Sequence, residues 1–386
     1  MIAVPLAVGL IMAAEMTSPG RAGDDAGAPA TVDTVGTAGD HGADSPSDEA
    51  PAVTEAGSLP EPVAAVPVPP PTVPPGTASG EPVTLAFGGD IAYQNPPGSP
   101  PIPDPADRLR PMEPLLAGAD LAVVNLETAI TERGTPVDKD FTFRAPASVL
   151  DSLATNGVDV VSMANNHGLD YGEEGLWDSL AAKAESPVAI IGIGADEDEA
   201  FAPHIAEVKG QRVAVIGATQ VLDRSVLDAW TATPTQGGLA SAKRVDRLVW
   251  EVARARAEAD TVVVFLHWGI ERETCPSDVQ QELAFQLVAA GADVIVGGHA
   301  HRVQGGGRMG DAVVNYGLGN FAFNAASPEA SATGVFEVTV AGRDVQDYKW
   351  QPGVIVDQVP YPLEGEQADA ALADWHQLRA CTGLNE

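Results

Sequence analysis

Short apolar runs rich in Val, Ile and Leu recur along the chain from about residue 82 onward, and each ends in a turn of glycine or polar residues. Runs of this length and composition, bounded in this way, predict buried β-strands. The predicted strands are residues 83–87, 121–125, 158–163, 189–193, 213–216, 261–267, 294–296 and 313–316.

Amphipathic stretches lie between several of these runs, and they predict helices at residues 147–156, 176–185, 241–259 and 278–290. Strands that alternate with helices indicate an α/β fold whose sheets are covered by helices. After residue 324 the pattern changes. Residues 334–340 and 346–356 predict an antiparallel pair, and a short closing helix is expected near residues 368–381.

The first 81 residues have a different character. Residues 2–14 are apolar and too few to span a bilayer, which is typical of the hydrophobic part of an export signal, although no Lys or Arg precedes them. Residues 17–80 contain no Phe, Trp or Tyr and are dominated by Pro, Ala, Gly and acidic residues, which predicts disorder. We expect a signal or anchor at 1–16, a linker at 17–81, the main domain at 82–325, and a β-pair and helix at 326–386 that complete it.

Charge and cysteine content narrow the functional classes. The formal net charge is -33, of which residues 1–81, with eleven acidic residues and one arginine, supply about a third. The folded part is therefore acidic too, and long-range repulsion disfavours nucleic acid as a partner. The protein is expected to be exported, either to the cell surface or to the exterior. The two cysteines, Cys275 and Cys381, could form one disulfide or remain two free thiols.

Metal-competent side chains follow five predicted strands at their carboxyl ends, where open α/β folds bind ligands. They are Asp90, Asn125 with Glu127, Asn165-Asn166-His167, His267, and His299 with His301. Each motif alone is also compatible with a turn, a helix cap or a hydrogen-bonded core histidine. Together they hold four of the seven histidines, which favours a metal site. Imidazole, carboxylate and amide ligands without a thiolate suit manganese, iron or zinc.

These motifs occur in one order along the chain: Gly89-Asp90, Asn125-Leu126-Glu127, Ala164-Asn165-Asn166-His167, His267-Trp268-Gly269, Gly298-His299-Ala300-His301 and Gly319-Asn320-Phe321. The series, from about residue 83 to 323, resembles that of CapA-type poly-gamma-glutamate (capsule) biosynthesis proteins, and Phe143-Arg144-Ala145-Pro146 is similar to another segment of that family. The resemblance implies a calcineurin-like metallophosphoesterase fold, with two face-to-face sheets flanked by helices. It also implies a function in making, anchoring or exporting an anionic envelope polymer such as poly-gamma-glutamate, alongside a membrane synthase complex.

The resemblance also implies roles for single residues. Asp90 and His301 would bind one metal, Glu127 would bridge, and Asn166, His267 and His299 would complete the second site. His167, Asp170 and Glu271 are the candidate catalytic residues, and Arg144, Asn165 and Asn320 the candidate substrate-binding residues.

One departure from the phosphoesterase pattern matters, because Ala92 stands where that pattern has a histidine. We therefore expect one tightly bound divalent ion and a looser second one. Three functions stay open. The protein could be a metal-dependent hydrolase or transferase, a non-catalytic accessory that binds the polymer, or a structural protein braced by metal.

Overall fold

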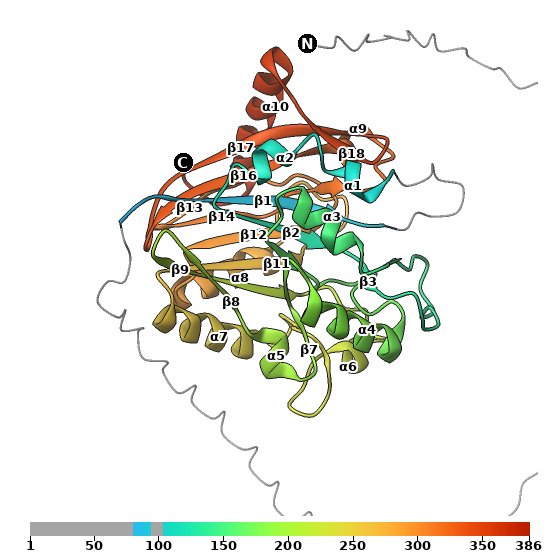
Figure 1. The fold of residues 1–386 in the computed structure, drawn as a ribbon. Helices are drawn as coiled ribbons and strands as arrows, with labels where there is room; N and C mark the ends of the chain where they lie inside the picture. The colour runs from blue at the N-terminus through green and yellow to red at the C-terminus, as the bar shows by residue number, and fades with distance from the viewer. Residues whose placement is uncertain (1–79, 94–102) are drawn as a thin grey trace, which may run out of the picture. The chain divides into compact units, whose positions relative to one another are not determined.

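The computed structural model describes residues 80–93 and 103–386 of the chain. The signal or anchor segment expected at 1–16, and nearly all of the linker expected at 17–81, lie outside the described residues. The described part contains two large β-sheets with helices on their outer faces (Figure 1). None of the helices in the described residues combines the length and the apolar composition of a membrane span.

The first sheet has the strand order β18-β17-β16-β1-β2-β5-β6, with β15 beside β1. Strands β1, β2, β5 and β6 run parallel, and β16, β17 and β18 extend the sheet in antiparallel fashion. The strands are β1 (Val83–Ile91), β2 (Leu121–Leu126), β5 (Val160–Ser162), β6 (Ala189–Ile191), β15 (Asn320–Ala322), β16 (Ala332–Ala341), β17 (Asp344–Val356) and β18 (Val359–Pro362).

The second sheet has the order β13-β14-β12-β11-β9-β8. Its central strands β9, β11, β12 and β14 are parallel, and the edge strands β8 and β13 pair in antiparallel fashion. The strands are β8 (His204–Val208), β9 (Gln211–Thr219), β11 (Thr261–Trp268), β12 (Val294–His299), β13 (Gly306–Met309) and β14 (Ala312–Asn315).

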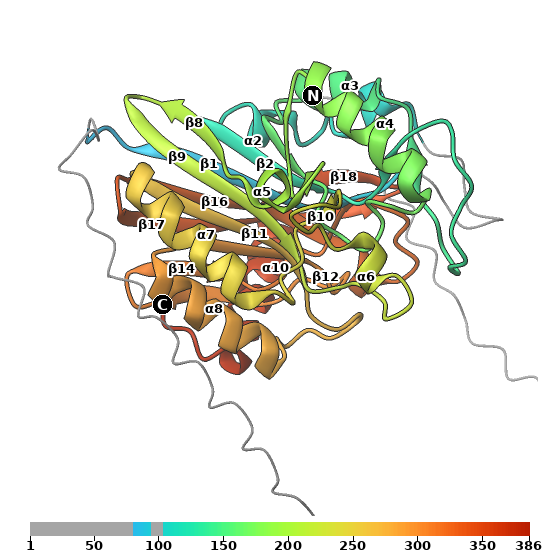
Figure 2. The same cartoon turned by 90° about the horizontal axis from the view of Figure 1, so that it is seen from below.

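The two sheets pack against each other, and helices cover their outer faces (Figure 2). Strand β1 shows why, because its side chains alternate: Leu85 and Phe87 enter the core between the sheets, whereas Ala86 faces the helices. Helices α1 (Pro105–Arg108), α2 (Glu113–Leu116), α3 (Val149–Thr155) and α4 (Gly172–Glu185) accompany the first sheet. Helices α7 (Val245–Glu258) and α8 (Asp278–Ala290) cover the second.

Shorter elements complete the described part of the chain. They are β3 (Ala129–Ile130), β4 (Arg144–Ala145), β7 (Ile193–Gly194), β10 (Gly238–Leu239), α5 (Glu197–Phe201), α6 (Leu227–Trp230), α9 (Pro328–Ser331), α10 (Gly365–Leu378) and the 3-10 helix η1 (Arg379–Cys381). Cys275 and Cys381 form a disulfide with a Cα–Cα distance of 5.7 Å, which decides between the two alternatives that the sequence left open. The bond ties the loop after β11 to η1.

The predicted fold class is confirmed: two sheets pack face to face between helices. All eight predicted strands are present, as are the four helices, the antiparallel pair and the closing helix. The strand predicted at 189–193 is interrupted at Gly192, whose φ of +83° suits glycine, so it forms β6 and β7. Sequence patterns missed the edge strand β8, where no residue is fully buried, and the edge strand β13, where two consecutive glycines remove the alternation of polar and apolar side chains.

Candidate metal centre

The carboxyl ends of β1 and β2 in the first sheet lie close to those of β11 and β12 in the second. Asp90 pairs with Asn125 across β1 and β2, and Trp268 pairs with His299 across β11 and β12. The two sheets meet closely here, because a Cβ atom on Gly298 would lie 2.2 Å from the Asp90 carboxylate oxygen Oδ1. A glycine is therefore required at position 298 for the Asp90 carboxylate to fit.

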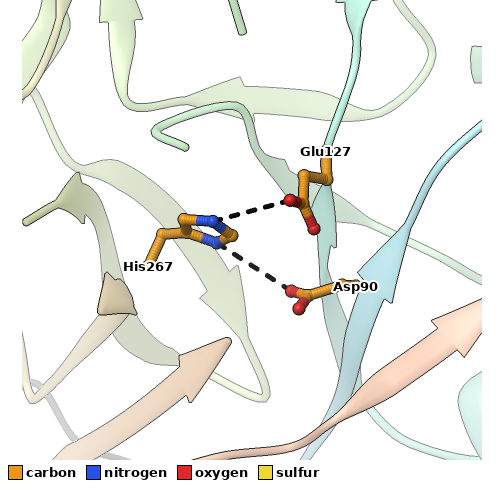
Figure 3. A group of neighbouring side chains, drawn as sticks. All are labelled: Asp90, Glu127 and His267. Atoms are coloured by element: carbon orange, nitrogen blue, oxygen red, sulfur yellow. Dashed lines mark ion pairs between the residues drawn. The ribbon is translucent and has the colours of Figure 1, made fainter. Parts of the chain in front are cut away.

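Asp90, Glu127 and His267 form the centre of the site, and all three are buried. The imidazole of His267 points one nitrogen toward each carboxylate, as Figure 3 shows. His267 Nδ1 lies 4.0 Å from Asp90 Oδ1, and His267 Nε2 lies 3.7 Å from Glu127 Oε1. Ligand atoms from both sheets thus face one small volume.

Glu127 carries the clearest sign that this volume suits a cation. Both of its carboxylate oxygens are buried, and neither accepts a hydrogen bond from the residues that the structure describes. Burial, and then the neighbouring charge of Asp90, raises the pKa of Glu127 well above its usual range. Buried polar atoms in proteins are normally paired, and buried charges are paired or coordinate metals. A divalent cation at Glu127 would satisfy both requirements.

His267 is oriented by two asparagines. The amide nitrogen Nδ2 of Asn125 can only donate, and it lies 3.1 Å from His267 Nδ1, so Nδ1 is the accepting nitrogen. Nε2 then carries the proton and donates to Asn166 Oδ1 at 2.8 Å. Burial, followed by the charge of His299, lowers the pKa of His267 well below its usual value, so the ring is neutral in the metal-free protein, and Nε2 would give up its proton on binding metal. Asn166 Oδ1, Glu127 Oε1 and His267 Nε2 therefore face one another.

His299 and His301 approach Asp90 from the loop after β12. The His299 backbone N–H donates to Asp90 Oδ2 at 2.9 Å, and His301 Nδ1 lies 3.6 Å from the same oxygen. Burial, and then the charge of His301, lowers the pKa of His299 to about 3, and its Nδ1, like the two Glu127 oxygens, is buried with no hydrogen-bond partner in the described part of the chain. Both histidines have positive φ angles, of 88° and 51°, which are unusual outside glycine and concentrate at functional sites.

His167 lies on the other side of Glu127, with its Nε2 3.8 Å from Glu127 Oε1. Its Nδ1 donates to Asp170 Oδ2 at 2.6 Å, and its ring packs 4.1 Å from that of Phe143. Burial lowers the pKa of His167, so the imidazole is neutral and presents an unprotonated Nε2 toward the site. This arrangement suits a group that accepts a proton and later returns it.

The other predicted residues lie at varying distances from this centre. Asn165 is fully buried, and its amide nitrogen donates to Asn125 Oδ1 and to the Leu126 carbonyl. Asn320 Oδ1 lies 2.7 Å from His301 Nδ1, within hydrogen-bond distance. Both asparagines therefore orient neighbouring side chains. Glu271 is exposed in the loop after β11, where its charge contributes to the raised pKa of Glu127, after burial and Asp90.

Arg144 is exposed on β4, and its guanidinium lies 4.7 Å from the centre of the Tyr171 ring. It lines a cavity of about 400 Å³ together with Tyr93, Thr131 and Glu132. This cavity is lined by none of the proposed metal ligands. The structure therefore brings the six proposed ligands and His167 together and places Arg144 in a neighbouring pocket.

Sequence reasoning did not assign roles to two residues that the structure places in the site. Asn125 donates to Asp90 Oδ1 at 2.8 Å, and its position near the end of β2, two residues before Glu127, was the available signal. Lys139 donates to the Asn166 carbonyl and to Asp170 Oδ1. It comes from the connection between β3 and β4, and no pattern in that connection distinguishes it from a surface lysine.

A comparison with known proteins matches this chain to one family. The profile of the bacterial capsule synthesis protein PGA_cap matches residues 84–325. The chain is 31% identical over 223 residues to the capsule biosynthesis protein CapA of Bacillus anthracis, covering 56% of this chain and 53% of that protein. It is 30% identical over 214 residues to a probable polyglutamine synthesis accessory protein of Mycobacterium tuberculosis, covering 52% of this chain and 56% of that one.

The chain thus spans about half the length of the curated relatives that it matches. Among solved structures, it aligns with a putative 5'-nucleotidase from Staphylococcus aureus with a TM-score of 0.46 and 15% identity, over 78% of this chain and 58% of that one.

Proposed function

Because the chain belongs to the bacterial capsule synthesis protein family PGA_cap, we propose that it acts in the synthesis, anchoring or export of poly-gamma-glutamate or a similar anionic envelope polymer. Its working part is a divalent-metal site with hydrolase or transferase activity. The proposal rests on one observation above all, the fully buried Glu127 carboxylate whose two oxygens accept no hydrogen bond from the described residues. Asp90 and His267 beside it supply further ligand atoms.

The ligands divide into two unequal sets. Glu127, Asn166, His267 and His299 would hold one ion, and Asp90 with His301 would hold a second one less tightly. Ala92 occupies the position where the phosphoesterase pattern has a further histidine, and it is buried beside β15 with its N–H donating to the Ala322 carbonyl. The oxygen and nitrogen donors suit manganese, iron or zinc.

A bound divalent ion would supply Lewis acidity and a more acidic bound water. The chain's own residues would do the rest. His167 Nε2 accepts the proton of the attacking group and returns it to the leaving group, while Asp170 holds the ring through Nδ1. Arg144, with its planar fork of donors, binds a carboxylate or phosphate of the substrate in the neighbouring cavity.

A second candidate function is a non-catalytic accessory that binds the polymer through the same site. The incomplete set at Asp90 and His301 favours it, since two-metal phosphoester chemistry needs both ions held firmly. The name of the Mycobacterium tuberculosis relative as an accessory protein points the same way. In both functions the protein is exported and works at the cell surface with a membrane synthase complex. The apolar residues 2–14 and the linker-like residues 17–80 motivate this placement.

The test uses the purified full chain. Metal-free protein is reconstituted with manganese, iron or zinc, its metal content is measured by mass spectrometry, and phosphomonoesters, phosphodiesters and poly-gamma-glutamate are screened for turnover and binding. Stoichiometric metal with turnover of one substrate class supports the enzyme. Metal with polymer binding and no turnover supports the accessory. Protein that retains no metal after reconstitution would refute the site.

A further inference from the structure

Lys139 reaches the metal centre from outside the strands that carry its ligands. It lies in the connection between β3 and β4, and its side chain is only 12% exposed. Its ammonium group donates to the Asn166 carbonyl, donates to Asp170 Oδ1 at 2.8 Å, and lies 5.2 Å from the centre of the Trp230 ring. We propose that Lys139 is a positioning residue that sets the geometry of a metal ligand and of the proton-transfer histidine together. This inference rests on the function proposed above.

The first contact acts on Asn166. Because Lys139 binds the backbone carbonyl of this residue, it fixes the peptide from which the Asn166 side chain projects. That side chain places its Oδ1 2.8 Å from His267 Nε2, so a shift of the Asn166 peptide would move an oxygen ligand away from the other ligands. Asn166 is followed directly by His167, and the same carbonyl contact therefore anchors the loop that carries both residues.

The second contact acts on His167 through Asp170. Asp170 is completely buried, and the β3–β4 connection binds it at three points: the Val137 N–H donates to its carbonyl, the Phe143 N–H donates to Oδ2 at 2.7 Å, and Lys139 donates to Oδ1. Oδ2 also accepts from His167 Nδ1. Lys139 supplies the cation that pairs with this buried carboxylate and holds it in the orientation in which His167 Nε2 faces Glu127.

The buried charges support a role specific to this site. The carboxylates of Asp90, Glu127 and Asp170 are fully buried, and Lys139 is the cation paired with one of them. The Lys139 ammonium therefore belongs to the same group of buried charges as the proposed metal ligands, unlike a lysine on the surface.

The experiment compares Lys139→Met with Lys183→Met in the full chain. Lys183 is a matched control because its ammonium also donates to one backbone carbonyl, that of Ile193, and to one carboxylate, that of Glu199, both at 2.9 Å and away from the metal centre. Metal-free proteins are titrated with Mn²⁺ by calorimetry, and the His167 Nδ1–H resonance is followed by NMR of ¹⁵N-histidine-labelled protein without metal.

Residues that orient metal ligands typically change metal affinity by about 10- to 100-fold, and we expect Lys139→Met to weaken Mn²⁺ binding by this factor. The His167 Nδ1–H resonance should shift or disappear by exchange. Lys183→Met should leave both quantities as in the wild type. Methylammonium or ethylammonium should partly restore Mn²⁺ affinity to Lys139→Ala, which a loss of packing alone would not allow.

Two results together would overturn the proposal: an unchanged His167 resonance in Lys139→Met, and a Mn²⁺ affinity within about threefold of wild type. A threefold change in affinity is well below the effect expected of an orienting residue. Absence of Mn²⁺ binding in the wild type itself would instead refute the metal site, and the NMR comparison would still decide whether Lys139 positions His167. If Lys139→Met does not fold by circular dichroism, Lys139→Gln is used in its place, and the same two measurements apply.

Discussion

Replacing Glu127 with glutamine should stabilise the metal-free protein and remove its response to metal. The substitution keeps the shape of the side chain and removes a buried carboxylate that lacks a hydrogen bond from the described residues. An unsatisfied buried polar group costs about 1–3 kcal/mol, and the amide avoids the part of this cost that comes from burying the carboxylate charge. At about 2–4 °C per kcal/mol for domains approaching this size, metal-free Glu127→Gln should therefore melt up to roughly 12 °C above the metal-free wild type.

Metal should reverse this order. Binding of a ligand at 100 times its Kd stabilises a folded protein by about 2.7 kcal/mol, so saturating Mn²⁺ should raise the melting temperature of the wild type by roughly 5–10 °C. Glu127→Gln should show little increase, because it lacks the proposed bridging carboxylate. Differential scanning calorimetry of the full chain with EDTA and with Mn²⁺ measures all four values.

The pH dependence of stability supplies a second test of the role of Glu127. Burial raises the pKa of Glu127 in the folded protein, whereas in the unfolded chain it ionises near its ordinary value of 4.5. Above pH 4.5 the unfolded state loses its proton while the folded state still holds one. The metal-free wild type should therefore lose stability relative to Glu127→Gln as the pH rises from 4.5 to the raised pKa, and the difference should then stay constant.

Glu251 offers a control with the opposite expectation. It is also buried, but Arg247 and Arg254 donate to its two oxygens at 2.7 and 2.9 Å. Glu251→Gln should destabilise the protein and leave the metal response intact. A metal-free Glu127→Gln variant that melts below wild type, or one that keeps the full Mn²⁺ shift, would refute the assignment of Glu127 as a metal ligand.

Three further predictions concern other parts of the molecule. His299→Ala should lose the tight ion and lower the melting temperature in Mn²⁺, while His301→Ala should mainly weaken the looser ion; mass spectrometry of metal content checks this, and equal retention in both would contradict it. Arg144→Lys should weaken polymer or substrate binding at unchanged metal content, because lysine lacks the planar fork. Replacing Cys275 by serine should reduce the free energy of unfolding by up to about 4.7 kcal/mol in the entropic treatment of a loop of about 100 residues, measured by urea denaturation.

Much of the fold was predictable because its signals are local. Helix α8 has the bounds expected from the sequence, since Ser277 and Gln280 form a capping box at its start and Gly291 ends it with a left-handed φ of 114°. Helix α4 begins at Gly172, four residues before the prediction, and no side-chain cap marks its start. Where a boundary has no capping residue, tertiary packing sets it.

The candidate site also has features that were predictable from the sequence and features that were not. The ligand types, their positions after strands and their order along the chain were visible in the sequence, because a strand followed by a polar loop is a local pattern. The contacts of His267 with Asp90 and Glu127 depend on the facing of two sheets and on the register of β1 with β2 and β11 with β12. No segment of the chain encodes those distances by itself.

By itself the sequence therefore determined the fold class, the family and the chemical nature of the candidate site. Only the tertiary structure decided that Cys275 pairs with Cys381, that Arg144 lies in a separate cavity, and that Lys139 reaches Asp170 and Asn166. The physical reason is that hydrophobic periodicity and capping act over a few residues, whereas these contacts join residues 27 to 106 positions apart and exist only once both sheets have packed.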